Sequence, residues 1–134
     1  MQETMTDMSG NVQEGAPGAP APARWWVACL CAQWCNTCRE YRPGFDALAR
    51  QWPQARFVWV DVEDEEELVG DLDVETFPTL LVGDAGGLRF FSPMQPQPAQ
   101  LDRLLRGLQD GAALPAVDDG QALALLRRLQ ALHP

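Results

Sequence analysis

A continuous apolar segment at residues 25–32 is followed by a pair of cysteines, Cys35 and Cys38, and then by a helical pattern. A short run without polar residues is typical of a strand that is buried on both faces of a sheet. From Tyr41 to Trp52, apolar side chains recur at three- and four-residue spacing, which places them on one face of a helix. The chain therefore places two thiols where a buried strand turns into an amphipathic helix.

The remaining pattern predicts three more strands and three more helices. Pro43 should kink the first helix and Pro53 should end it. In chain order the further elements are a strand at 57–62, a helix at 64–72, strands at 77–82 and 88–91, a helix with Leu101, Leu104, Leu105 and Leu108 on one face, and a final helix bearing Leu125, Leu126, Leu129 and Leu132 that Asp118 or Asp119 can cap. Two strand–helix units before a hairpin predict a mixed α/β sheet, in which parallel strands are joined by crossovers and an antiparallel pair lies at the edge.

Length and charge limit the classes of function. A chain of 134 residues is long enough for a single core. Its formal charge of −9 argues against nucleic acid and anionic membrane as partners, because both select for clustered lysine and arginine. No segment reaches the roughly 18 apolar residues of a membrane-spanning helix. We expect a monomer.

The ends of the chain differ in composition from its middle. Residues 1–23 finish in an Ala/Pro-rich stretch, which we interpret as a disordered tail. A polar N-terminus without a basic start and an apolar stretch does not resemble a secretory signal, so we expect a cytoplasmic location. The domain should then span residues 24–111, with a helical extension at 112–134.

The position of the cysteine pair favours redox chemistry. A helix N-terminus offers unpaired N–H groups and a positive dipole end, which stabilise a thiolate at Cys35. Cys38 lies three residues on, on the same side of the helix, where it can attack a mixed disulfide on Cys35. Trp34 provides a flat apolar rim for a peptide. The alternative, two cysteines that simply fill the core, is less consistent with this junction.

The run 32–39, Ala-Gln-Trp-Cys-Asn-Thr-Cys-Arg, resembles the active site of the thioredoxin family, written Trp-Cys-x-x-Cys followed by Lys or Arg. Pro43 stands where that family has its kinking proline, the run 60–63 is similar to its central strand and exit, and the run 77–79 is similar to its cis-proline segment. The resemblance implies a thioredoxin-like fold and a thiol–disulfide oxidoreductase without a cofactor. It also implies protein disulfides as substrates, a reductase or small thiol as external electron donor, substrate contacts from Trp34, Phe77 and Pro78, and a cis bond before Pro78.

The chain also departs from the family. The usual first strand and first helix have no counterpart, so the sheet should have about four strands, and a C-terminal helix is added. Asn36 and Thr37 replace the frequent Gly-Pro, which the resemblance links to a less strongly reducing couple. Cys29 stands where the family often has a buried aspartate, so we expect slower resolution by Cys38 or another base, for which Asp61 and Glu63 are candidates.

Cys31 occupies a position that is often aromatic in the family. Cys29 and Cys31 point to the same face of their strand. A disulfide between strand residues two apart rarely has suitable geometry, so we interpret both as small core residues.

Two other functions remain open. One is a thioredoxin-like interaction module without significant turnover, whose acidic surface and extra helix bind a partner. The four cysteines could instead form a metal site if the strand thiols face the helix start, although paired and separated Cys-x-x-Cys knuckles are the usual pattern.

Overall fold

The computed structural model describes residues 22–111 and 116–134. Its elements are, in order, β1 (Trp25–Cys31), α1 (Asn36–Gln51), β2 (Ala55–Asp61), α2 (Glu66–Val69), β3 (Thr79–Asp84), β4 (Gly87–Pro93), α3 (Pro98–Gln109) and α4 (Gly120–Leu132). The predicted order of elements is confirmed. The predicted tail falls almost entirely outside the described residues.

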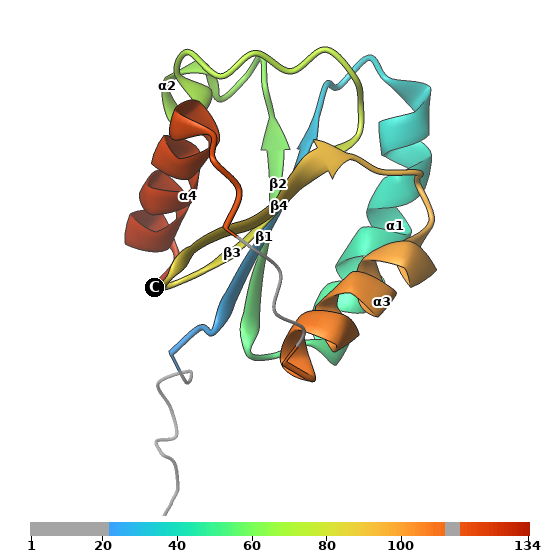
Figure 1. Cartoon of the computed structure of the whole chain (residues 1–134). Helices are drawn as coiled ribbons and strands as arrows, with labels where there is room; N and C mark the ends of the chain where they lie inside the picture. The colour runs from blue at the N-terminus through green and yellow to red at the C-terminus, as the bar shows by residue number, and fades with distance from the viewer. Residues whose placement is uncertain (1–21, 112–115) are drawn as a thin grey trace, which may run out of the picture.

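The four strands form one mixed sheet in the order β2-β1-β3-β4. β1 is parallel to β2 and antiparallel to β3, and β3 and β4 form the predicted antiparallel hairpin at one edge. The carboxyl ends of β1 and β2 and the start of β3 therefore meet at one end of the sheet, which is uppermost in Figure 1. This end carries the cysteine motif.

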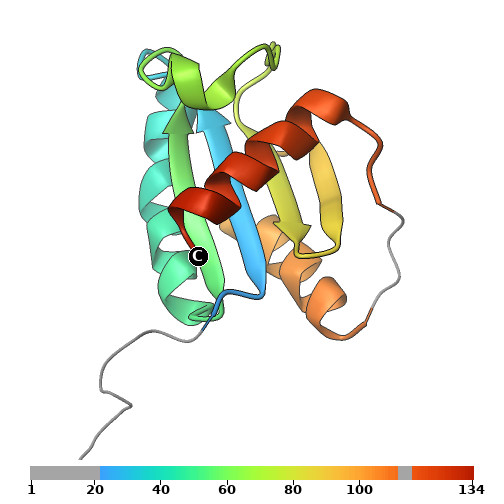
Figure 2. The same ribbon diagram turned by 90° about the vertical axis from the view of Figure 1, so that its left-hand side faces the viewer.

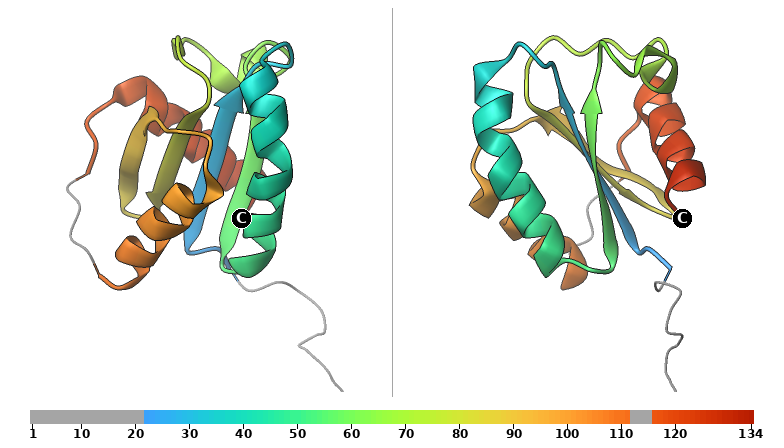
Figure 3. Two further views of the ribbon diagram at one scale, coloured as in Figure 1. Left: turned by 90° about the vertical axis from the view of Figure 1, so that its right-hand side faces the viewer. Right: turned by 180° about the vertical axis from the view of Figure 1, so that it is seen from behind.

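Strand β1 is buried along its whole length, and its alternating side chains serve two separate cores. Trp25, Val27, Cys29 and Cys31 face α1 and α3, while Trp26, Ala28 and Leu30 face α4. Figure 3 shows α1 and α3 lying across one face of the sheet, and Figure 2 shows α4 crossing the other. The central strand thus has helices on both sides, as a continuous apolar run requires.

Helix α4, the added C-terminal helix, packs on the face of the sheet opposite α1 and α3. Asp119 caps it by accepting a hydrogen bond from the Ala122 backbone N–H at 3.0 Å. Its leucines at 125, 126 and 129 are fully buried against the sheet. Trp26 Nε1 also donates to the His133 carbonyl at 2.8 Å, which ties the end of the helix to β1.

Some element boundaries differ from the predicted ones. Helix α2 covers only Glu66–Val69 instead of 64–72, because Asp61 Oδ1 accepts hydrogen bonds from the Glu63 and Asp64 N–H groups and holds that stretch as a turn. Helix α1 continues past Pro43. Among the described residues, no helix is long and apolar enough to span a bilayer.

Candidate redox site

The two cysteines of the motif lie at the start of α1 with different exposure. Cys35 is the N-cap residue, in extended conformation, and is partly exposed. Its N–H donates to the Ala32 carbonyl at 3.0 Å, and its own carbonyl accepts from the Arg39 N–H at 3.2 Å. Cys38 is in the first turn and is only 1% exposed. A substrate therefore reaches Cys35 first, and Cys38 lies behind it.

The structure pairs Cys38 with Cys31 in a disulfide, while Cys35 and Cys29 are free. Our interpretation of Cys31 as a small core residue thus missed its bond, and the expected Cys35–Cys38 pair is not the one joined here. The reason is the alternation of β1, which turns Cys31 toward α1, where Cys38 is on the inner side of the first turn. Their Cα atoms are 6.0 Å apart, within the usual range for disulfides.

Cys29 lies beneath this disulfide. Its sulfur is 3.5 Å from Cys31 Sγ, and because Cys31 is in a disulfide, the Cys29 S–H is the donor of this contact. Cys29 is fully buried, and this burial raises the pKa of its thiol far above the usual value, while the positive charge of Arg42 opposes the rise. Cys29 is therefore a neutral thiol that can donate a weak hydrogen bond, and a poor base.

Tyr41 lies in the same core cluster, one turn after Cys38. Its hydroxyl is buried and has no hydrogen-bond partner among the described residues. Burial, and secondarily the charge of an ionised Cys29, raise the pKa of Tyr41. Neither buried group next to the disulfide accepts a proton readily.

The two carboxylates considered as bases have other partners. Asp61 is paired with Cys31 in the strand register, but its side chain caps the turn after β2. Glu63 Oε2 accepts a hydrogen bond from Trp34 Nε1 at 3.2 Å. Both carboxylates therefore hold other groups in place: Asp61 holds the turn after β2, and Glu63 holds the Trp34 ring.

Trp34, which precedes Cys35 in the chain, packs against Phe77, and Pro78 lies buried directly after Phe77. Trp34 is 63% exposed, an unusual state for so large an apolar side chain, and its ring meets the edge of Phe77 with centroids 5.7 Å apart. The Phe77–Pro78 bond is cis, as the resemblance implied. The carbonyl of buried Pro78 accepts from the Met94 N–H at 3.2 Å, which links the loop to the end of β4. The structure therefore brings Trp34 and Phe77 into contact, and the docking role of these residues and of Pro78 stays a prediction.

Asn36 and Thr37, the dipeptide between the cysteines, are both exposed. The Asn36 side-chain oxygen accepts a hydrogen bond from the Arg39 guanidinium. This contact holds a positive charge on the outer surface of the first turn of α1.

In residues 22–111 and 116–134, no three or more His, Cys, Asp or Glu side chains are grouped to hold a metal ion. Two of the four sulfurs are joined to each other, so they are not thiolate ligands in this state.

The family model for thioredoxin matches residues 21–104, which is more than half of the chain. The chain belongs to the thioredoxin family. It is 32% identical to mitochondrial thioredoxin-3 of Saccharomyces cerevisiae over 57 residues, which are 42% of this chain and 45% of that protein. It is 31% identical to the thioredoxin of Ophiophagus hannah over 48 residues, 36% of this chain and 46% of that protein. The match thus spans less than half of the length of each of these relatives.

A solved structure supports the same assignment. The X-ray structure of Fasciola hepatica thioredoxin is 28% identical, with a TM-score of 0.57, and the alignment covers 63% of this chain and 81% of that chain. The thioredoxin-like fold predicted from the motifs is confirmed, including its mixed four-stranded sheet and additional C-terminal helix.

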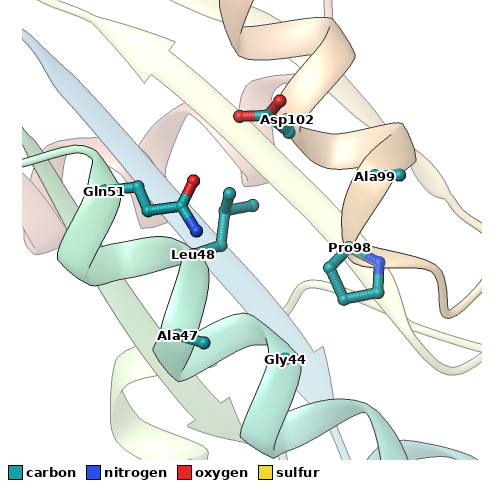
Figure 4. A pocket seen from close by; sticks show the side chains of 7 residues that line it. All are labelled: Gly44, Ala47, Leu48, Gln51, Pro98, Ala99 and Asp102. Atoms are coloured by element: carbon teal, nitrogen blue, oxygen red, sulfur yellow. The ribbon is translucent and has the colours of Figure 1, made fainter.

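This thioredoxin-family chain also has a hollow of about 290 Å³ between α1 and α3 (Figure 4). Gly44 permits the close approach of the two helices, since a Cβ there would overlap with the Pro98 ring. At the other end of the hollow, Asp102 accepts hydrogen bonds from Arg106, which chiefly holds its pKa below the usual value, and from Trp52. The hollow is formed by helix contacts and contains none of the redox residues.

The feature that sequence reasoning missed is the partner of Cys38. The signal was present, because Cys29 and Cys31 were placed on one face of the strand. The sequence pattern did not show which helix covers that face. In the structure α1 covers it, so Cys31, at the end of the strand, contacts the first turn of α1.

Proposed function

We propose that this chain is a thiol–disulfide oxidoreductase that reduces or exchanges disulfides of protein substrates through Cys35 and Cys38. The observation that carries the proposal is the graded exposure of two cysteines in the first turn of α1. Cys35 is partly exposed and follows the exposed Trp34, whereas Cys38 is buried. This arrangement suits an attacking thiol followed by a resolving thiol.

In the reductive reaction, the Cys35 thiolate attacks one sulfur of a substrate disulfide and forms a mixed disulfide. The other substrate sulfur leaves as a thiolate and takes a proton. Cys38, in its reduced state, then attacks the Cys35 sulfur, which releases the second substrate sulfur and leaves a Cys35–Cys38 disulfide. An external thiol or reductase supplies the two electrons that restore the dithiol.

The surface beside Cys35 supports a peptide as substrate. The Trp34 ring is fixed from two sides, by the Phe77 ring and by the Glu63 carboxylate, so its exposed face is held next to the attacking sulfur. Phe77 borders the same surface through its contact with the Trp34 ring, and an extended peptide can bind there. Within this proposal the protein works as a monomer in the cytoplasm, where donors keep thiols reduced.

The test is reduction of insulin disulfides with dithiothreitol as donor, compared between the wild type, Cys35→Ser and Leu132→Ala. Leu132 is exposed on α4, outside the site, and serves as the matched control. We expect Cys35→Ser to fall to the rate of dithiothreitol alone and Leu132→Ala to match the wild type. Undiminished reduction by Cys35→Ser would exclude this assignment.

The interaction-module alternative gives a different result in the same assay. A wild-type protein with its thiols reduced and accessible, but without turnover above the dithiothreitol rate, would favour that alternative. The acidic residues Glu65, Glu66 and Glu67 next to the site would then be the first surface to test for partner binding.

A further inference from the structure

We propose that Cys31 is a third redox-active thiol, which competes with Cys35 for Cys38, so that the oxidised protein exchanges between a Cys31–Cys38 and a Cys35–Cys38 disulfide. The proposal rests on the oxidoreductase function proposed above and names an internal control of that site. Its starting observation is that Cys38 is joined to Cys31 although Cys35 lies three residues before it.

Two cysteines, Cys31 and Cys35, lie where each can form a disulfide with Cys38. Cys35 and Cys38 are three residues apart at a helix start, where their side chains lie on the same side. Cys31 ends the buried strand that underlies this turn, and its bond to Cys38 is already formed. The Cys38 sulfur therefore has two possible partners. One is Cys31, in the strand beneath the helix, and the other is Cys35, at the N-cap.

The exchange step balances without an external oxidant. The Cys35 thiol loses its proton to solvent, and its thiolate attacks Cys38 Sγ. A Cys35–Cys38 bond forms, the Cys31–Cys38 bond breaks, and the electron pair leaves on Cys31 Sγ, which takes up a proton. The protein contains one disulfide before and after the step, and the reverse step uses Cys31 as the attacking sulfur.

Cys29 has a specific place in this exchange. Its sulfur is 3.5 Å from Cys31 Sγ, and as a buried neutral thiol it can donate to Cys31 when that sulfur leaves with negative charge. An S–H donor is weak, but it is a contact that the structure gives directly to the Cys31 sulfur, within a cluster made mostly of apolar side chains. Cys29 is therefore a positioning residue for the exchange.

The two disulfides give the protein different chemistry. In the Cys35–Cys38 form, the accessible thiol is consumed. In the Cys31–Cys38 form, both bonded cysteines are about 1% exposed, while Cys35 remains a free and accessible thiol without a resolving partner. A mixed disulfide formed on Cys35 in that state persists until an external thiol removes it.

The first test is a disulfide map of the oxidised full-length wild type, quenched in acid. Trypsin leaves all four cysteines in the peptide between Arg24 and Arg39, but chymotryptic cleavage after Trp34 separates Cys31 from the other two. A Cys31–Cys38 bond then links two peptides, and a Cys35–Cys38 bond lies within one. We expect both species, whereas a single species of either kind would overturn the exchange.

The second test shows whether the two forms interconvert. A maleimide added slowly to the native oxidised protein reacts with Cys35 only in the Cys31–Cys38 form. Exchange would draw the whole population into that form until about one label is bound per molecule. Labelling that stops at the initial fraction would contradict the proposal.

A matched pair of variants removes one strand thiol each. Oxidised Cys31→Ala should take no label, because Cys35 is held by Cys38. Oxidised Cys29→Ala should still approach one label per molecule, but more slowly than the wild type, because the donor to the leaving Cys31 sulfur is lost. Equal labelling of the two variants would refute a specific role of Cys31. The insulin assay is independent of these results: no turnover with both disulfides present would reject the proposed function alone, and turnover with only Cys35–Cys38 would reject this inference alone.

Discussion

The buried Cys29 thiol should make the stability of the fold fall as the pH rises above about 8.5. Cys29 is fully buried in the core under α1, and this burial raises the pKa of its thiol in the folded state. Arg42 opposes the rise, but its effect is the smaller one. In the unfolded chain the same thiol titrates at about 8.5.

The sign and size follow from proton linkage. Above about pH 8.5 the unfolded chain loses the Cys29 proton while the folded protein keeps it, so the unfolded state is favoured and the free energy of unfolding decreases. The full stabilisation is present below the unfolded pKa and is lost as the pH rises toward the folded one. One such group contributes up to about 1.4 kcal/mol per pH unit, and about 1 kcal/mol in all between pH 8 and pH 9.5.

The assay is urea unfolding followed by tryptophan fluorescence at pH 8 and pH 9.5, with the protein kept reduced by a phosphine. The Cys29→Ala variant has the same remaining thiols, so their titration cancels in the comparison. We expect the wild type to lose about 1 kcal/mol more than Cys29→Ala over this interval. The reasoning is refuted if the two proteins lose stability equally.

Three further substitutions test the docking surface, the added helix and the missing carboxylate. Trp34→Ala should raise KM for a protein disulfide about tenfold and leave reduction of a small aromatic disulfide unchanged, because the exposed ring binds peptide, as steady-state kinetics would show. Leu126→Ala should lower the free energy of unfolding by about 2–5 kcal/mol, whereas Leu132→Ala, at an exposed position, should lower it by less than about 0.5 kcal/mol. Urea unfolding measures both values, and equal losses would contradict the packing of α4 on the sheet. Cys29→Asp should speed resolution by Cys38 about tenfold or more, measured as decay of a trapped mixed disulfide, and an unchanged rate would remove the base argument.

Much of the architecture could be predicted from patterns that are local in the chain. The apolar run at β1 has no polar face, which predicts a central strand covered on both sides. In the structure β1 is buried along its whole length. The leucines of α4 repeat at helical spacing, which predicts a helix with one apolar face packed against another apolar surface. The structure supplies that surface on the face of the sheet opposite α1.

Two boundaries could not be predicted because side-chain and backbone contacts override the pattern. The acidic run after β2 has the composition of a helix start, but the Asp61 carboxylate binds two of its N–H groups and delays the helix to Glu66. Strand β3 begins at Thr79 rather than at Phe77, since the preceding Pro78 has no N–H for the ladder.

The third sulfur shows why a motif alone does not determine a redox site. Cys38 can bond only one sulfur at a time, so its partner depends on the relative free energies of two disulfides, and β1 contributes directly to one of them. Every second side chain of that strand faces α1. Cys29 and Cys31 therefore lie beneath the helix whichever residues stand between Cys35 and Cys38. A change in the buried strand, far from the surface that a substrate meets, should therefore shift the reactivity of Cys35 through the population of Cys31–Cys38.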